Sequence, residues 1–150
     1  MVLKEKNDRK FENMKDREVI IRLILEIFPR TQAIYLFGSY GTDQERPESD
    51  ADIALLITPK EAKGVGLLMA SDLRSDLESL LNKDVDLINL RLVSTVLQKE
   101  VITADRRIYT GDLYAAEEFE MLTLSYYQKL NEERAEIING ALADGRFHLV

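Results

Sequence analysis

The chain contains no cysteine and few residues that interrupt regular structure, with 0 Cys, 3 Pro and 7 Gly among 150 residues. The absence of cysteine excludes a disulfide framework, a thiolate zinc site and a cysteine nucleophile. Long apolar runs are also missing, since none approaches the roughly 20 residues that a membrane helix needs. The charged N-terminus lacks the apolar core of a signal peptide. These absences predict a cytoplasmic protein with no membrane segment.

Basic residues are outnumbered by acidic ones, 20 against 27, which gives a formal net charge of -7. A broad nucleic-acid-binding surface depends on clustered Lys and Arg, so nucleic acid is a poor candidate for the substrate. The acidity is concentrated late, because the segment 112–140 holds seven acidic and two basic residues. Such a face is usually solvated, but it also suits a basic partner. The single histidine, His148, follows Gly145 in a tail, where a polar surface role is favoured over a ligand or base.

The length and the hydrophobic content of 45% predict a single domain over residues 1–150 with its own core. Apolar runs predict strands near 33–37, 53–57, 83–90 and 107–110. Helical periodicity predicts helices over about 8–28, around 73–81, over 94–104 and over 112–143. The glycines of Gly64-Val65-Gly66 are expected at a loose entry into the second of these helices. Helices crossing between strands predict an α/β (α+β) fold, a small mixed sheet flanked by helices.

The two terminal helices carry the clearest apolar stripes. The N-terminal helix is expected to pack on the sheet through Ile20, Leu23, Ile24 and Ile27. The long C-terminal helix, capped by Asp112, is expected to bury Phe119, Leu122, Tyr126 and Leu130. Leu124 and Tyr127 widen the second stripe, which indicates that part of this helix faces a partner or a second copy.

One stretch carries most of the functional information: Gly38-Ser39, ten residues, then Asp50-Ala51-Asp52, placed between two apolar strands. Side chains two apart on a strand share a face, so Asp50 and Asp52 are expected to present adjacent carboxylates at the mouth of a sheet. Like charges this close repel unless a cation lies between them, and oxygen ligands of this kind suit Mg²⁺. Gly38 allows close approach of a phosphate, and Ser39 supplies a donor. A metal site beside a phosphate cradle predicts nucleotidyl transfer.

Each half of this motif also has an ordinary structural explanation. Gly-Ser is a common turn, and an Asp before an apolar strand often bonds only its own backbone. The ordered combination is much more specific than either part. A third acid, Asp86, lies between Val85 and Leu87, so its carboxylate would project to the face opposite theirs. Asp84 shares the parity of Asp86 but lies nearer the strand start, where a cap or turn role is favoured.

These residues resemble the G-S-x10-D-x-D signature of the polymerase-beta-like nucleotidyltransferase superfamily, and residues 31–110 resemble its catalytic core. The short chain is similar to the minimal branch of the superfamily, above all to the MntA-type antitoxins that accompany HEPN ribonuclease toxins. The resemblance implies a polymerase-beta-like fold and a third carboxylate at Asp86. It also implies that ATP is the substrate, a preference for adenine that nothing else in the sequence indicates.

The acids also predict how the reaction proceeds. We expect Asp50 and Asp52 to hold the Mg²⁺ that binds the triphosphate, and to share a second Mg²⁺ with Asp86, which also suits a general base. Gly38 and Ser39 would hold the β- and γ-phosphates so that the α-phosphate lies in line with the acceptor. The nucleoside monophosphate would be transferred and pyrophosphate released.

These residues do not identify the acceptor of the nucleotide. The catalytic core uses most of the chain and leaves no separate acceptor domain, which favours a protein acceptor. The resemblance implies a hetero-oligomer in which AMP is transferred to a tyrosine of a cognate HEPN RNase toxin and silences it. Three alternatives stay open. One is a nucleotidyltransferase for a small molecule such as an aminoglycoside, against which the short length argues. Another is an antitoxin that acts by binding only, against which the retained acids argue. The least favoured is a plain structural module.

Overall fold

The protein is described from a computed structural model that covers residues 2–68 and 71–143, so His148 lies outside the described residues. The elements follow one another in the order α1 (Val2–Ile27), β1 (Ala33–Phe37), β2 (Ala51–Leu56), α2 (Pro59–Val65), α3 (Asp72–Leu81), β3 (Val85–Asn89), α4 (Thr95–Thr103), β4 (Arg107–Thr110) and α5 (Leu113–Ala143). All four predicted strands are present. Within the described ranges no helix is both long and apolar enough to cross a membrane.

The four strands form one mixed sheet in the order β3-β2-β1-β4. β1 runs antiparallel to β2 and β4, whereas β2 and β3 are parallel. The end of β1 therefore meets the start of β2, with Phe37 opposite Asp52, and Asp52 in turn lies opposite Asp86 of β3. This topology brings both halves of the Gly-Ser and Asp-x-Asp motif to a single end of the sheet.

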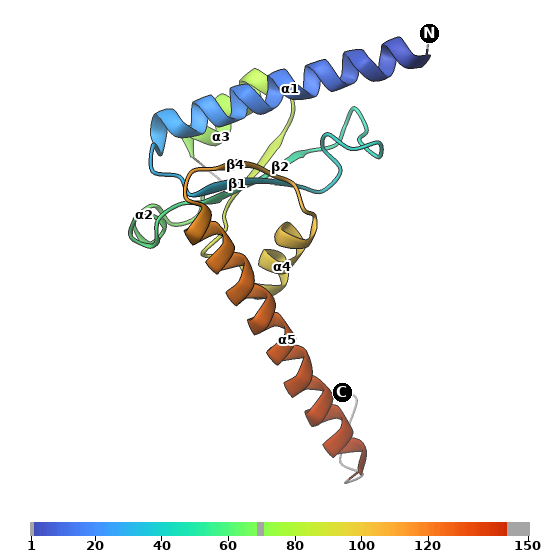
Figure 1. Ribbon diagram of the computed structural model, residues 1–150, viewed down its shortest axis with the longest axis vertical. Coiled ribbons are helices and arrows are strands. Elements are labelled where there is room, and N and C mark those ends of the chain that lie inside the picture. Colours follow the sequence, from blue (N-terminus) through green and yellow to red (C-terminus); the bar gives the residue numbers. More distant parts are fainter. Residues whose placement is uncertain (1, 69–70, 144–150) are drawn as a thin grey trace.

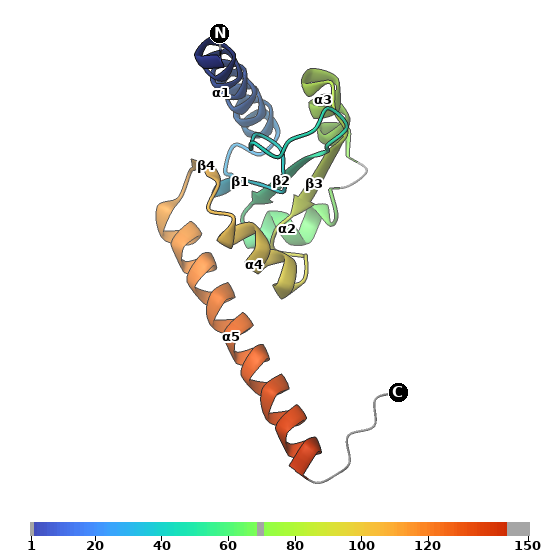
Figure 2. The same ribbon diagram turned by 90° about the vertical axis from the view of Figure 1, so that its right-hand side faces the viewer.

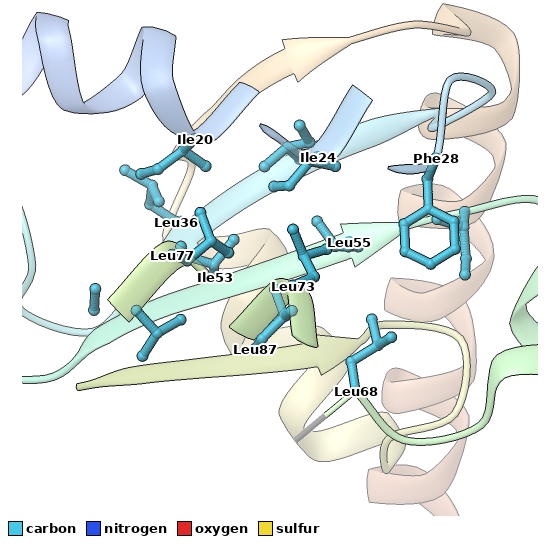
Figure 3. Packing of buried hydrophobic residues seen from close by; sticks show 14 of the residues in the cluster. Ile20, Ile24, Phe28, Leu36, Ile53, Leu55, Leu68, Leu73, Leu77 and Leu87 are labelled. Atoms are coloured by element: carbon cyan, nitrogen blue, oxygen red, sulfur yellow. The ribbon is translucent and has the colours of Figure 1, made fainter. Parts of the chain in front are cut away.

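Alternating side chains divide the core into two layers, one on each face of the sheet. On one face, Leu36, Ile53 and Leu55 pack against α1 and α3, as Figure 3 shows for Ile20, Ile24, Leu73 and Leu77. On the other face, Tyr35, Ala54, Leu56 and Ile88 pack against α4 and the start of α5. Figures 1 and 2 show the same arrangement, with α1 and α3 on one side of the strands and α4 and α5 on the other.

Local sequence signals explain where the helices begin. Ser71 and Ser94 are the N-caps of α3 and α4 and accept hydrogen bonds from backbone N–H groups of the first turn. Asp112 caps α5 as predicted, since its Oδ1 accepts a hydrogen bond of 3.0 Å from Ala115 N. The N-terminal helix begins at Val2, earlier than the predicted start near Asp8.

Two details of the predicted helices are wrong. Ile27 is 47% exposed, and Phe28, just beyond the helix, fills the core in its place. Gly64-Val65-Gly66 does not open the following helix. It ends the separate short helix α2, which Pro59 begins, and Gly66 adopts a φ of 61° at the C-cap. A positive φ of this kind favours glycine, which is the physical reason for the residue there.

The buried face of α5 also differs from the prediction. Leu122 and Tyr126 are 53% and 65% exposed, whereas Ala116 and Thr123 are buried and Phe119 packs beside them. Small side chains on this face let α5 approach the sheet and α4 closely, and this rotates the larger apolar residues outward. Figure 1 shows α5 projecting far from the sheet beyond this contact. Of the two residues predicted to widen the stripe, Leu124 is 41% exposed, whereas the half-buried Tyr127 lies against α4, with Lys99 Nζ 5.0 Å from its ring centroid.

Candidate active site

Three carboxylates gather where β2 and β3 begin. Asp52 and Asp86 are each the second residue of their strand and lie opposite one another in the parallel pair. Neighbouring strands are about 4.8 Å apart, and residues in register share a face, so the two side chains are adjacent. Asp50 lies just before β2 rather than within it. The structure thus brings together the three acids that the sequence singled out.

The surroundings of Asp52 oppose its ionisation. Burial, followed by the negative charges of Asp86 and Asp50, raises the pKa of the Asp52 carboxyl from 3.8 to about 6. No ion pair to another side chain in the described part of the chain neutralises the three acids. The negative charge that gathers here is therefore not offset by an ion pair within the described residues.

The three acids fit Mg²⁺ by their chemistry. Mg²⁺ usually takes one or two carboxylates and completes its shell with water and substrate phosphates. Among residues 2–68 and 71–143, however, no three His, Cys, Asp or Glu side chains stand as a group that could hold a metal ion. One or two carboxylates, with water and phosphate as the other ligands, suffice for Mg²⁺, so this result is compatible with that mode of binding.

Gly38 occupies a position that only glycine suits, for a reason that the sequence did not reveal. Its φ is 69°, and a Cβ added to it would overlap the Oδ2 atom of Asp52. The bare backbone of Gly38 therefore makes room for the Asp52 carboxylate. The two halves of the motif are in direct contact through this pair, so the glycine and the acid form one unit.

The loop Gly38–Thr42 follows β1 and is held by several side chains. Thr42 donates to the carbonyl of Ser39 from its backbone N at 3.0 Å and from its Oγ1 at 2.6 Å. The Tyr40 hydroxyl donates to Asp16 Oδ2 of α1 at 2.9 Å. Arg106, just before β4, donates from Nη1 to the Gly38 carbonyl at 3.1 Å and from Nη2 to the Tyr40 carbonyl.

Glu45 holds the far side of this loop. Its Oε2 accepts a hydrogen bond of 3.2 Å from Gly41 N, and its Oε1 forms an ion pair of 3.0 Å with Lys83. Sequence reasoning missed these supporting residues. The one available signal was the second glycine, Gly41, which has a φ of 74° and whose added Cβ would lie 2.9 Å from Arg106 Nη2.

Asp84 is not among the acids whose charges raise the pKa of Asp52. It is exposed and directly precedes β3, where its carbonyl accepts a hydrogen bond of 2.8 Å from Ala51 N. It also lines an open polar pocket of about 540 Å³ together with Ser49, Glu78 and Lys83. None of Gly38, Ser39, Asp52 or Asp86 lines that pocket. The structure thus places Asp86, and not Asp84, beside Asp52.

A mixed sheet that sets paired acids of two adjacent strands against a glycine-serine loop is the arrangement of a nucleotidyltransferase. The family described as "Polymerase beta, Nucleotidyltransferase" matches residues 20–113. This chain belongs to that family.

Individual relatives show which kinds of nucleotidyltransferase this chain is similar to. The protein adenylyltransferase MntA of Shewanella oneidensis is 38% identical over 125 residues, which cover 83% of this chain and 86% of the relative. A chain in a crystal structure of a toxin–antitoxin with AMP-PNP has a TM-score of 0.67 and 36% identity, covering 84% of this chain and 98% of its own length. A chain from the structure of a tri-AMPylated Shewanella oneidensis HEPN toxin in complex with MNT antitoxin has a TM-score of 0.64 and 36% identity. The match covers 86% of this chain and 98% of that chain.

Proposed function

We propose that this protein is an antitoxin that transfers AMP from ATP to a tyrosine of a cognate HEPN RNase toxin. The observation that carries the proposal is the meeting of Asp50, Asp52 and Asp86 with the loop Gly38–Thr42 at one end of the sheet. The relatives support it, since one is named as a protein adenylyltransferase and others come from toxin–antitoxin complexes.

Asp50, Asp52 and Asp86 would hold Mg²⁺, with two ions as the expected number. When bound, Mg²⁺ neutralises phosphate charge and lowers the pKa of an attacking hydroxyl. The raised pKa of Asp52 supports this assignment, because it reflects burial and, after it, the charges of Asp86 and Asp50, which no ion pair of the described residues balances.

The chain's own groups supply binding and proton transfer. The Ser39 hydroxyl and the N–H groups of its loop bind the β- and γ-phosphates, which leaves the α-phosphate facing the three acids. The tyrosine oxygen of the partner forms a bond to the α-phosphorus while the bond to pyrophosphate breaks. Because a tyrosine hydroxyl has an ordinary pKa of about 10, it needs a base, and Asp86 accepts its proton.

The surface of α5 supports a protein acceptor. Large apolar side chains stand exposed along it, including Tyr114 at 78%, Met121 at 62% and Ile137 at 69%. The segment 112–140 carries seven acids against two bases, which suits a basic partner such as an RNA-binding enzyme. AMP attached beside an RNase centre adds bulk and negative charge and so repels RNA. We place this complex in the cytoplasm.

The same surface keeps a second function in view, an antitoxin that neutralises its toxin by binding alone. Exposed apolar residues on a projecting helix would serve occlusion as well as substrate docking. The two functions differ in whether the acids are needed, because occlusion uses α5 and leaves the carboxylates idle.

Transfer of label tests the proposal. The protein is purified with its co-expressed toxin and incubated with Mg²⁺ and ATP labelled in the α-phosphate. We expect label on the toxin, and chelation of Mg²⁺ should abolish it. Label on neither protein, with the complex intact, would favour occlusion. Label on a small molecule and not on the toxin would favour the small-molecule nucleotidyltransferase.

A further inference from the structure

We propose that Arg106 is a positioning residue for the triphosphate, one that acts by fixing the peptide groups of the loop Gly38–Thr42. The inference rests on the proposed function, since it deepens the account of the same nucleotide site. Arg106 lies 68 residues from Gly38 in the sequence, yet its guanidinium donates to the carbonyls of both Gly38 and Tyr40.

A β-bulge brings Arg106 to this position. Ala33 and Ile34 lie opposite Thr110 and Tyr109, but Tyr35 lies opposite Arg107, so Ile108 is an extra residue on β4. Beyond the bulge, the Arg106 carbonyl accepts a hydrogen bond of 3.0 Å from Leu36 N. Bulges near active sites commonly re-aim a side chain.

The bulge also separates two neighbouring arginines by function. Arg107 turns to the face that carries α5, where its Nη1 forms an ion pair of 3.1 Å with Glu120. Arg106 turns to the loop beside α1. Burial, followed by the positive charge of Arg17, lowers the pKa of the Arg106 guanidinium there. Two adjacent arginines thus contact different parts of the molecule, and this supplies a matched control.

The contacts of Arg106, together with those of Thr42, orient the loop amides. In a trans peptide group the carbonyl and the N–H point in opposite directions. The carbonyls of Gly38, Ser39 and Tyr40 all accept hydrogen bonds from Arg106 or Thr42. The N–H groups of Ser39 and Tyr40 have no acceptor among the residues that the structure describes. The peptide groups of these two N–H groups carry the carbonyl of Gly38, which Arg106 holds, and the carbonyl of Ser39, which Thr42 holds. Both carbonyls face the protein, so the two N–H groups are directed away from it, as in the backbone concavities that bind anions.

Arginine suits this pair of contacts better than lysine does. Its planar guanidinium carries several donors in a fixed arrangement, whereas the lysine ammonium is a single point charge on a flexible stem. Because Arg106 bonds to loop carbonyls, its effect on phosphate is exerted through the loop. The prediction is therefore specific to the β- and γ-phosphates, and AMP, which lacks both, should not sense the change.

The test compares Arg106→Ala, Arg106→Lys and the control Arg107→Gln in the full chain with Mg²⁺, by calorimetric titration with AMP-PNP and with AMP. We expect Arg106→Ala to weaken AMP-PNP binding by at least about tenfold, the change that follows from losing charge-assisted hydrogen bonds. Binding of AMP should be unchanged. Arg106→Lys should recover part of the AMP-PNP affinity, and Arg107→Gln should bind both ligands like the wild type.

Two results would overturn the assignment: wild-type AMP-PNP affinity in Arg106→Ala, or an equal loss of AMP and AMP-PNP affinity. Thermal unfolding of each variant accompanies the titrations. If Arg106→Ala is unfolded, Arg106→Lys decides, with a selective loss for AMP-PNP expected and an unselective loss or none contradicting it. Failure of the wild type itself to bind AMP-PNP would instead reject the proposed function.

Discussion

Strand β2 has two parts of opposite character, an apolar part and an acidic residue at its start. From Ile53 to Leu56 every residue of β2 is fully buried and apolar, whereas Asp52, the residue before them, has carboxylate neighbours in Asp50 and Asp86. One part of the strand stabilises the fold by burial, and the other gathers charges that repel. Stability and function are thus divided between adjacent residues of the same strand, and substitutions in the two parts should have opposite consequences.

The largest expected effect is on turnover at the acidic end. Asp50→Asn, Asp52→Asn and Asp86→Asn should each lower AMP transfer by at least about a hundredfold, because metal ligands supply several kcal/mol of charge stabilisation. The fold should remain intact. Asp84→Asn is the matched control and should retain near wild-type turnover. Near wild-type rates in any of the first three, at saturating Mg²⁺, would remove that acid from the site.

The apolar part of β2 should respond in stability instead. Leu55→Ala should lower the free energy of unfolding by roughly 2–5 kcal/mol, as expected when a fully buried leucine is truncated. The fraction that stays folded should keep its KM for ATP. Urea unfolding measures the loss, and Leu80→Ala, at a side chain 57% exposed, should change stability by less than about 0.5 kcal/mol. A large rise in KM for Leu55→Ala would show that the two parts of the strand are not separable.

Gly38→Val should disturb nucleotide binding and catalysis together. A side chain at this position overlaps the Asp52 carboxylate, and the valine backbone must adopt a positive φ. We expect loss of both AMP-PNP binding and turnover. Calorimetry and a transfer assay should therefore fall together. If binding were lost while turnover at saturating ATP survived, the overlap with Asp52 would be of no consequence.

Ser39→Ala should be milder. It removes one hydrogen-bond donor to phosphate, so AMP-PNP binding should weaken by about 1 kcal/mol, and by more if the bond is charge-assisted. Turnover at saturating ATP should change little. The AMP-PNP affinity of Ser39→Ala is measured beside that of Thr42→Val, a second loop variant. An unaltered affinity of Ser39→Ala would show that the Ser39 hydroxyl does not bind the phosphates.

The smallest effect is a pH dependence of stability in the metal-free protein. The pKa of Asp52 is raised from 3.8 to about 6, so between these values the native state binds more protons than the unfolded chain. The free energy of unfolding should therefore decrease as the pH rises from about 4 to about 6 through this group. Asp52→Asn should lack this pH-dependent component. Above about pH 6, the free energy of unfolding of the metal-free variant should therefore be higher than that of the metal-free wild type.

Unfolding measured with a chelator and then with Mg²⁺ checks this component. Mg²⁺ should restore stability to the wild type above about pH 6, and should do so less in Asp52→Asn. An identical pH profile for the two proteins in chelator would mean that neither burial nor the neighbouring acids raise the pKa of Asp52 in the native state.

The strands and the three acids could be predicted because their signals are local. Apolar runs marked the strands, and Asp52 and Asp86 stood out as charges within such runs. The role of Arg106 could not be predicted, because it depends on the extra residue Ile108 and on a strand pairing between distant segments. The buried face of α5 was also beyond reach, since Ala116 and Thr123 are buried by close contact with the sheet and α4 although larger apolar residues lie nearby.

The central claim is that the carboxylates at the start of β2 and β3 modify a protein partner. It is tested most directly by intact-mass measurement of the HEPN toxin after co-expression with the wild type or with Asp52→Asn. We expect a toxin heavier by one or more AMP units with the wild type, and an unmodified, active toxin with the variant. A toxin that is unmodified in both cases and neutralised in both would contradict it.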